Sequence, residues 1–325
     1  MGAVLVTGGA GYIGSRVASV LLAQGREVVV LDNLSTGSRE WVPSSAEFVM
    51  GSVHNMCLVG ELLKSYQIKS VLHFAGSIKV EESVRDPLKY YHNNVEGIRC
   101  LLEAVYGRVE HFIFSSTAAV YGTPEHSPVA EDAPLCPLSP YGRSKVMAEA
   151  ILADVALCPL LPIRYAILRY FNVAGGGYEL EQRPTHLMRA ALAVAGGRQD
   201  HLEIFGTDYP TTDGTAVRDY IHLSDLVDAH LLALEHLEDG GASDTYNVGY
   251  GHGYSVFEVH AAAERAVGRC IPMRYVGRRQ GDAAAVIADA SKLRDQLGWR
   301  PVRDDLDAML REQYEWECSQ NPPAA

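Results

Sequence analysis

The first half of the chain alternates short apolar runs with longer segments whose apolar residues recur at helical spacing. The apolar runs are rich in β-branched and aliphatic residues and lack strict alternation, which is typical of strands buried on both faces. They lie at Ala3–Thr7, Glu27–Leu31, Glu47–Met50, Ser70–Phe74, His111–Ser115 and Ile163–Arg169. The helical segments between them lie at Ile13–Gln24, Met56–Tyr66, Val95–Tyr106 and Tyr141–Leu157. This alternation predicts an α/β fold with a doubly wound parallel sheet of the Rossmann type.

After about Asn172 the pattern is less regular. Three glycines at 175–177 predict a loop, and Ser255 with Glu258 has the spacing of a helix capping box. Further helices are expected near Leu187–Ala195 and at Ser224–Leu237, with strands near Leu202–Phe205 and Val217–Ile221. We therefore expect a nucleotide-binding domain over residues 1–172. Residues 173–325 should form mainly a smaller mixed α/β domain over the mouth of the sheet, with some segments returning to that sheet.

Composition narrows the class of partner. The 325 residues contain 28 Lys and Arg against 40 Asp and Glu, a formal net charge of −12. Bulk charge of this sign argues against binding nucleic acid or an anionic membrane, but it allows a local basic pocket. The six cysteines include no Cys-x-x-Cys pair, the histidines show no zinc-ligand spacing, and no apolar run is long enough for a signal peptide or a membrane span. We expect a soluble cytoplasmic protein with free thiols and no metal.

A glycine-rich segment, Thr7–Gly14, follows the first strand and opens the first helix. Gly8 allows the tight turn, Gly11 lets backbone N–H groups approach a pyrophosphate, and Gly14 allows close packing of helix on sheet. Asp32 ends the second strand, where a carboxylate can accept hydrogen bonds from ribose hydroxyls and repels a 2′-phosphate. The loop therefore predicts NAD rather than NADP. The competing interpretation, a glycine-rich turn with a helix-capping Asp, does not explain why all these residues fall in register.

A tyrosine and a lysine four residues apart, Tyr141 and Lys145, lie on one face of a predicted helix. A phenol has an ordinary pKa of about 10, and a nearby ammonium and a positive nicotinamide ring both favour the phenolate. Alone, this spacing is common by chance and is typical of a surface. Residues 115–117, Ser-Ser-Thr, change the interpretation because they end the fifth strand, on the side of the sheet where ligands bind. Together these groups predict a hydride-transfer site.

With these motifs, the chain resembles the extended short-chain dehydrogenases/reductases, and among them the UDP-glucose 4-epimerase family, over nearly its whole length. The resemblance rests on segments 4–15, 31–34, 73–76, 87–91 with 93–95, 112–116 with 120–122, 139–145, 168–172, 204–206 with 208–210, 217–222 and 278–282. The last two segments are the most specific to the epimerase branch. The resemblance implies tightly bound NAD, a UDP-sugar substrate, and a homodimer in which Val95–Tyr106 and Tyr141–Leu157 form a four-helix bundle.

The resemblance also implies residue roles. Tyr141 would accept and donate the proton, and Thr117 would hydrogen-bond the sugar 4-oxygen. Lys145 would tune Tyr141 and bind the ribose. The residues implied to line NAD are Gly8, Gly11, Tyr12, Ile13, Gly14, Asp32, Asn33, Ser52, Val53, Phe74, Ala75, Gly76, Asn93 and Ser115, with Tyr141, Lys145 and Tyr170. Those implied to hold the substrate, with Thr117 and Tyr141, are Phe171, Asn172, His186, Leu187, Phe205, Arg218, Arg279, Asp282 and Val286. For Arg218 and Arg279, the alternative is ordinary ion pairing with Asp219 and Asp282.

Some positions depart from the family pattern. Ser52 stands where the family often has an Asp that contacts adenine, and His186 where some members have Asn. Val286 stands where some members carry a bulky Tyr, so 2-acetamido sugars are expected to fit as well.

The activities of related nucleotide-sugar enzymes are less well supported. A 4,6-dehydratase needs Asp-Glu directly after Thr117 and a decarboxylase needs Glu at 119, whereas Ala118 and Ala119 stand here. A non-catalytic NAD-sensing scaffold would be expected to lack the Tyr or the Lys.

Overall fold

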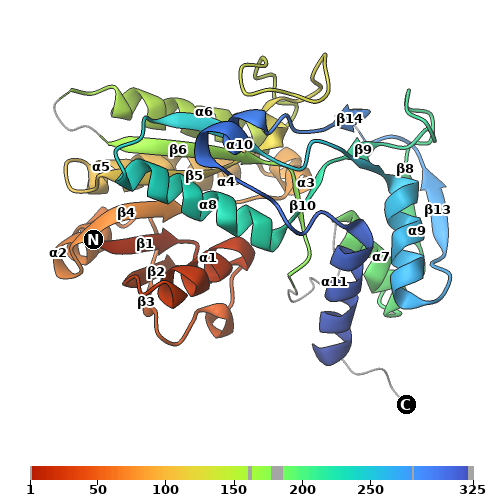
Figure 1. The fold of residues 1–325 in the computed structure, drawn as a ribbon, viewed down its shortest axis with the longest axis horizontal. Helices are drawn as coiled ribbons and strands as arrows, with labels where there is room; N and C mark the ends of the chain where they lie inside the picture. Colours follow the sequence, from red (N-terminus) through yellow and green to blue (C-terminus); the bar gives the residue numbers. More distant parts are fainter. Residues whose placement is uncertain (1, 160–162, 177–185, 280–281, 321–325) are drawn as a thin grey trace.

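A seven-stranded parallel sheet forms the centre of the protein in a computed structural model, which describes residues 2–159, 163–176, 186–279 and 282–320 (Figure 1). The strand order is β11-β6-β5-β4-β1-β2-β3. The strands are β1 (Ala3–Thr7), β2 (Val28–Asp32), β3 (Glu47–Met50), β4 (Ile68–His73), β5 (His111–Thr117), β6 (Arg164–Tyr170) and β11 (Asp244–Val248). The predicted Rossmann-type fold class is confirmed. Because all neighbours are parallel, the carboxyl ends of the strands share one edge.

Helices cover both faces of this sheet, as a parallel sheet requires. The helices α1 (Tyr12–Ala23) and α8 (Leu223–Glu238) lie on one face, and α2 (Met56–Ser65), α5 (Gly97–Val105) and α6 (Pro140–Ala156) lie on the other. Along β1, Val4 and Val6 pack toward the first face and Leu5 toward the second, and all three are fully buried. Side chains of alternating direction along each strand thus produce two separate apolar layers.

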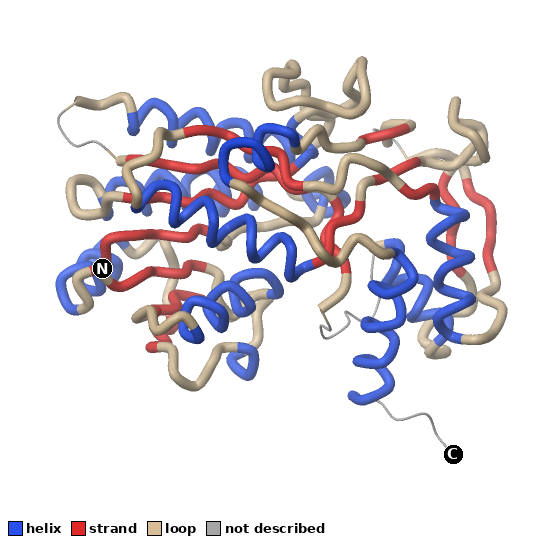
Figure 2. Tube along the Cα trace, in the orientation of Figure 1, coloured by secondary structure: helices blue, strands red, loops and turns tan. Residues whose placement is uncertain are grey.

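A smaller lobe lies beyond the carboxyl ends of the strands (Figure 2). Its helices are α7 (Leu187–Ala195), α9 (Val256–Val267) and α11 (Leu306–Gln320). Its short strands pair as β8 (Leu202–Phe205) with β13 (Met273–Val276), and as β9 (Val217–Arg218) with β12 (Tyr254–Ser255) and β14 (Ala285–Val286). A third pair, β7 (Asn172–Ala174) with β10 (Tyr220–His222), directly follows β6 and connects the lobe to the sheet.

The remaining elements are short. They are the helices α3 (Val80–Arg85), α4 (Pro87–Tyr90) and α10 (Ser291–Leu297), the 3₁₀ turns η1 (Arg39–Trp41) and η3 (Ala118–Val120), and a π-helical stretch, η2 (Tyr91–Glu96). Of the described helices, none is long and apolar enough to cross a membrane. Gly177, expected in a loop, and residues 280–281 of the epimerase-like segment lie outside the described residues.

Several sequence predictions need correction. Val217–Ile221 was expected to be one strand, but it divides into β9 and β10, which belong to different sheets. The helix expected at Val95–Tyr106 is α5, and it continues a helical segment that begins at Pro87 and passes through the π-helical stretch. The sequence analysis missed β11, which pairs with β6 at one edge of the large sheet. The capping box at Ser255 is confirmed, because Ser255 and Glu258 exchange both hydrogen bonds.

Candidate active site

The glycine loop has the geometry of a phosphate site. Gly8 has a φ of +72°, and a Cβ there would lie 2.5 Å from the backbone nitrogen of Ala75. A Cβ on Gly14 would lie 2.4 Å from the carbonyl oxygen of Gly8, so both positions require glycine. At the N-cap of α1, Gly11 offers no side chain to bond the first N–H groups of the helix. These N–H groups and the positive end of the helix dipole therefore suit a pyrophosphate.

Asp32 is held rigidly at the carboxyl end of β2. It is 9% exposed, and its two carboxylate oxygens accept hydrogen bonds from the backbone N–H groups of Ala10 at 3.0 Å and Leu34 at 2.8 Å. Each oxygen keeps a lone pair that a ribose hydroxyl can use. The adjacent Asn33 bonds the N–H of Ser35 with its side-chain oxygen. The donors of the glycine loop and this fixed carboxylate therefore fit NAD.

The loop after β4 is held in place by two asparagines of η2. Asn94 accepts a hydrogen bond from the backbone N–H of Ser77 at 2.7 Å and donates one to Ser144 of α6 at 2.9 Å. Asn93 donates to the hydroxyl of Ser77 at 2.8 Å. A Cβ on Gly76 would lie 3.0 Å from Asn94 Oδ1. The π-helical turn thus directs the side-chain amides of Asn93 and Asn94 toward the loop of residues 74–77, which passes beside the glycine loop.

The first turn of α6 presents Tyr141. This helix begins at Pro140, and the Ser139 hydroxyl caps it by accepting from the N–H of Gly142 at 3.1 Å. Tyr141 is 8% exposed, and Thr117 at the end of β5 hydrogen-bonds its phenol. Burial raises the pKa of Tyr141 to about 12, and the hydrogen bond from Thr117 only partly opposes this rise. The structure thus brings the two predicted hydroxyls together.

Lys145 lies one turn further along α6, and its ammonium donates a hydrogen bond to the backbone carbonyl of Ser115 at 2.8 Å. Burial lowers the pKa of Lys145 to about 8, while the charge of Glu149 acts in the opposite direction. That Lys145 and a nicotinamide ring together favour the phenolate of Tyr141 stays a prediction. The ammonium is directed to the strand carbonyl, and burial of the phenol dominates its pKa.

An ion pair that the sequence analysis missed lies behind this site. Glu149 of α6 and Arg169 of β6 are both buried and approach to 2.6 Å between Oε2 and Nη2. Glu149 also accepts a hydrogen bond from Ser116, and Arg169 donates to the hydroxyl of Tyr121 at 3.0 Å. Glu149 lies four residues after Lys145, on the same helix face, which was the one signal in the sequence. No pattern in the sequence pointed to its partner, Arg169.

Aromatic residues wall the site on the side of β6. The hydroxyl of Tyr170 hydrogen-bonds that of Ser115, and burial raises the pKa of Tyr170. His230 of α8 lies between Phe74 and Tyr170, with ring centroids 4.9 and 5.9 Å away. Burial lowers the pKa of His230 to about 4. These rings come from β6, α8 and the loop after β4, and they form an aromatic wall on this side of the site.

A second cluster, in the smaller lobe, gathers the predicted substrate arginines. Arg279 places its guanidinium carbon 4.2 Å from the ring centroid of Phe205, and its Nε lies 3.3 Å from Asp282. Arg218 lies 3.8 Å from the same carboxylate and donates to the carbonyl of Ala283 at 2.8 Å. The suggested pairing with Asp219 is wrong, because its buried carboxylate accepts backbone N–H groups of residues 250, 251 and 288. The cluster places two cations beside an aromatic ring.

The other substrate candidates border this cluster. Asn172 of β7 hydrogen-bonds Tyr220, whose ring lies 6.1 Å from that of His186 before α7. Neither ring nitrogen of His186 has a partner within the described structure, and burial lowers its pKa to about 3. Val286 pairs in register with Arg218 and belongs to the same apolar cluster as Phe171. Leu187 begins α7.

The remaining cofactor candidates are spread along the edge of the sheet. Tyr12 donates from its hydroxyl to the carbonyl of Gly175 at 2.5 Å, and Ile13 follows it in α1. Ser52 and the buried Val53 follow β3, two strands from the glycine loop on the side away from Tyr141. The candidates thus form a continuous row rather than one cluster.

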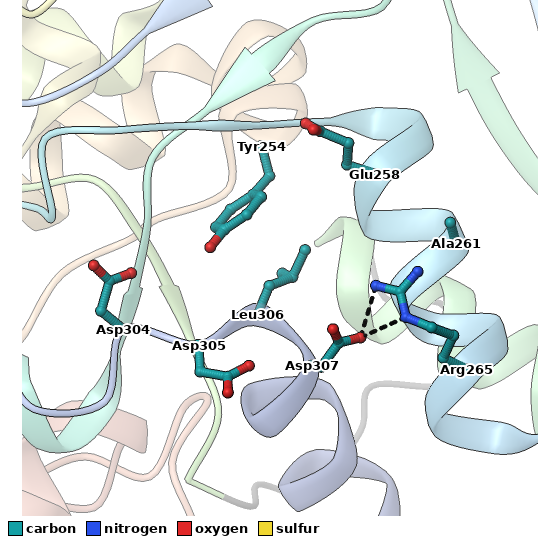
Figure 3. Close-up of a pocket in the computed structure, with 8 residues that line it drawn as sticks. All are labelled: Tyr254, Glu258, Ala261, Arg265, Asp304, Asp305, Leu306 and Asp307. Carbon is teal, nitrogen blue, oxygen red and sulfur yellow. Dashed lines mark hydrogen bonds and ion pairs between the residues drawn. The ribbon is translucent and has the colours of Figure 1, made fainter.

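Figure 3 shows a separate hollow in the smaller lobe. It is lined by Tyr254, Glu258, Ala261, Arg265, Asp304, Asp305, Leu306 and Asp307. Arg265 pairs with Asp307 across it at 2.8 Å. No predicted site residue lines this hollow, so we do not assign it to the active site. Within the described ranges, no group of three or more His, Cys, Asp or Glu side chains is placed to hold a metal ion.

Comparison with known proteins places this arrangement in a family. Residues 4–249 match the model of the NAD dependent epimerase/dehydratase family. The chain is 47% identical to a UDP-glucose 4-epimerase of Azospirillum brasilense over 97% of its own length and 92% of the relative. It superposes with a TM-score of 0.94 on a UDP-glucose-4-epimerase from Stenotrophomonas maltophila with bound NAD and formylated UDP-arabinopyranose, at 40% identity and full coverage of both chains.

A third comparison concerns the range of sugars in the family. The UDP-Glc/GlcNAc 4-epimerase from Campylobacter jejuni superposes with a TM-score of 0.87 at 40% identity, covering 98% of this chain and all of that chain. Each relative matches across the large sheet and the smaller lobe together. The chain belongs to the NAD dependent epimerase/dehydratase family and, within it, to the family of the UDP-glucose 4-epimerases.

Proposed function

We propose that this protein interconverts UDP-glucose and UDP-galactose by inverting the configuration at C4 of the hexose. The observation that carries the proposal is the hydrogen bond between Tyr141 and Thr117, next to Lys145 and at the end of the row of cofactor candidates. NAD, when bound, supplies a hydride acceptor and later a hydride donor, so the overall reaction involves no net redox change. The described cysteines are all free thiols, which supports a cytoplasmic location.

The protein's part in the reaction is proton transfer and orientation. Tyr141 takes the proton of the sugar 4-hydroxyl and returns it to the 4-keto sugar, while Thr117 hydrogen-bonds the same oxygen. With its pKa at about 12, the phenol alone is a poor base at neutral pH. Positive charge from Lys145 and from the oxidised nicotinamide ring favours the phenolate when the site is filled. The burial that raises the pKa also strengthens this electrostatic effect.

The cluster in the smaller lobe would hold the UDP part while the sugar turns. Arg218 and Arg279 supply positive charge for the diphosphate, and Phe205 supplies an aromatic face beside them. A substrate held only through its nucleotide leaves the sugar free to present either face to the hydride acceptor. Dehydration and decarboxylation are disfavoured, since Ala118 and Ala119, which follow Thr117 in η3, have no acidic group.

We propose further that 2-acetamido sugars are accepted. Val286 belongs to the same apolar cluster as Phe171 and pairs in register with Arg218, and these two contacts support a position near the sugar. A side chain of this size leaves more room at C2 than a Tyr would. The dual activity named for the Campylobacter jejuni neighbour supports this range of substrates.

We also propose a homodimer formed through α5 and α6. Apolar side chains are exposed next to α6 on the adjoining short helices, with Val84 of α3 65% exposed and Leu88 of α4 76% exposed. Met147 of α6 itself is 44% exposed. Exposed apolar side chains on neighbouring helices are consistent with an interface that a second copy would cover.

Proton NMR of UDP-galactose, incubated with the purified protein and no added NAD, tests the proposed function. New anomeric signals of UDP-glucose are expected, because the cofactor would be retained between half-reactions. Tyr141→Phe should lower turnover by about 10²–10⁴-fold while leaving bound NAD unchanged, since only the proton acceptor is lost. Absence of turnover in the wild-type protein, even after NAD is added, would refute the proposal.

The pH dependence of turnover tests the electrostatic role of Glu149. Its negative charge raises the pKa of Lys145, so Glu149→Gln should bring that pKa below about 8. Lys145 would then lose its charge at a lower pH, and the alkaline fall in kcat should begin earlier. Breaking the buried pair with Arg169 should also lower the free energy of unfolding by about 3–5 kcal/mol. Glu103→Gln, at an exposed ion pair, is the control. An alkaline limb that does not move would contradict this role.

Substrate range is tested at Val286. With UDP-N-acetylgalactosamine and UDP-galactose in parallel tubes, Val286→Tyr should abolish epimerisation of the acetamido sugar and spare that of the hexose. Val286→Ala is the matched control and should retain both, because it adds no volume near C2. Equal loss of both activities in Val286→Tyr would show that residue 286 does not control the space available at C2 of the sugar.

Sedimentation velocity tests the proposed dimer. The wild-type protein should sediment as a dimer, and Leu88→Glu should shift it toward the monomer because a charge would be buried in the interface. Val302, 78% exposed in the loop between α10 and α11, provides the control substitution Val302→Glu, which should leave the dimer intact. A wild-type monomer at all concentrations would exclude this assembly.

A further inference from the structure

The ammonium of Lys145 is buried with only modest support from polar groups. An ammonium has three donor hydrogens, and one of them goes to the backbone carbonyl of Ser115, a neutral acceptor, at 2.8 Å. The charge of Glu149 favours the ammonium, but Arg169 approaches that carboxylate to 2.6 Å and offsets part of its effect. The proposed mechanism needs a positive charge on Lys145, so a further source of stabilisation for this charge matters.

An aromatic ring lies directly against this ammonium. The Nζ atom of Lys145 is 4.8 Å from the ring centroid of Phe114, which is 1% exposed. The face of an aromatic ring is its negative side, and it attracts a cation within about 6 Å, more strongly where water is excluded. Along β5, Phe112, Phe114 and Ser116 point toward the side covered by α6, where Ser116 bonds Glu149. The strand thus places the Phe114 ring beneath the turn of α6 that carries Lys145.

No second cation competes for the ring on the side of β4. His73 pairs in register with Phe114, and its imidazole stacks on the phenyl ring with centroids 5.9 Å apart and planes 20° from parallel. Burial lowers the pKa of His73 to about 3, so the imidazole is uncharged at physiological pH. Its Nδ1 lies 2.7 Å from the hydroxyl oxygen of Thr7, which fixes the orientation of the ring. Lys145 is therefore the cation that the Phe114 face attracts.

The other elements around Lys145 contribute few titratable groups. On α6 these are Tyr141, one turn before Lys145, and Glu149, one turn after it. On β6, Arg169 is directed to Glu149, and the hydroxyl of Tyr170 bonds that of Ser115. The loop after β4 has no titratable side chain at residues 74–77. The ring face is thus a main source of negative potential for the ammonium besides Glu149.

We propose that Phe114 is a positioning residue of the proton-transfer site, and that the face of its ring stabilises the charged ammonium of Lys145. A carboxylate in this place would cancel the positive charge that favours the phenolate of Tyr141. The ring attracts the same cation but carries no net charge and accepts no proton. It can therefore support the charge of Lys145 without becoming a competing base. The catalytic consequence of this inference rests on the proposed function.

Fluorinated phenylalanines at position 114 of the full-length holoprotein test the inference. One, two or three fluorine atoms withdraw electron density from the ring face and change the size of the side chain little. Because the ring favours the charged form of Lys145, weakening the ring face should lower the pKa of Lys145 stepwise. The ammonium is then lost at a lower pH, and the alkaline fall in kcat should begin earlier, by roughly one pH unit with three fluorines.

Phe112 provides the matched control. It lies on the same side of β5, is fully buried in the same apolar cluster, and also contacts His73, with ring centroids 6.0 Å apart. The same fluorinated residues at 112 should leave the alkaline limb in place, whereas Phe114→Leu should move it as three fluorines do. An alkaline limb that stays fixed in every Phe114 variant would overturn the inference. Equal shifts at 112 and 114 would overturn it as well, because they would reflect packing.

A second readout does not require turnover. The ammonium of Lys145 is titrated by ¹⁵N NMR in the holoprotein without a UDP-sugar, and its signal is identified by its absence in Lys145→Arg. This titration should move to lower pH with each fluorine at position 114. If it moves while the wild-type protein fails to epimerise UDP-galactose, only the proposed activity is refuted. If the protein epimerises UDP-galactose but neither readout responds to fluorine, only the role of Phe114 is refuted.

Discussion

The buried ion pair between Glu149 and Arg169, together with the hydrogen bond from Ser116, connects β6 to α6 and β5, the two elements that carry the proposed catalytic side chains. Glu149 lies one turn beyond Lys145 on α6 and bonds Ser116, which separates Ser115 from Thr117 on β5. Arg169 adjoins Tyr170 on β6. Burying two charges is costly unless further hydrogen bonds satisfy them, and here a serine, a tyrosine and a backbone carbonyl do so. The pair therefore orients the site more than it stabilises the fold.

Electrostatics divides the site into parts with different tasks. Around Tyr141 and Lys145, burial dominates. It raises the pKa of Tyr141 and lowers the pKa of Lys145, so it favours the neutral form of both side chains. In the smaller lobe, two partly exposed arginines share the carboxylate of Asp282, and Arg279 also pairs with Glu81 at 3.5 Å. This cluster offers an acidic chain a local pair of arginines, which we propose as the site of the diphosphate.

Much of the cofactor half was predictable from local patterns. Gly8, Gly14 and Asp32 belong to short segments whose roles follow from backbone geometry at a strand end, and the structure shows those geometries. The hydroxyls of residues 115–117 were located by the rule that parallel strands end at one edge. The pairing of Glu149 with Arg169 was not predictable, because the two are twenty residues apart on different elements. The hydrogen bond between His54 Nε2 and the backbone carbonyl of His92 was equally hidden, since the two residues are 38 positions apart.

The amino-acid sequence by itself determined the alternation of buried strands and amphipathic helices, and hence the parallel sheet and its ligand-binding edge. These properties depend on spacing within ten to twenty residues, where hydrophobic periodicity and glycine geometry act directly. Only the tertiary structure decided that Val217–Ile221 divides between two sheets and that β11 closes the large sheet. It also decided that Lys145 bonds a strand carbonyl rather than the phenol. These outcomes depend on which distant groups compete for the same hydrogen bond or sheet edge, and that competition exists only once the chain has folded.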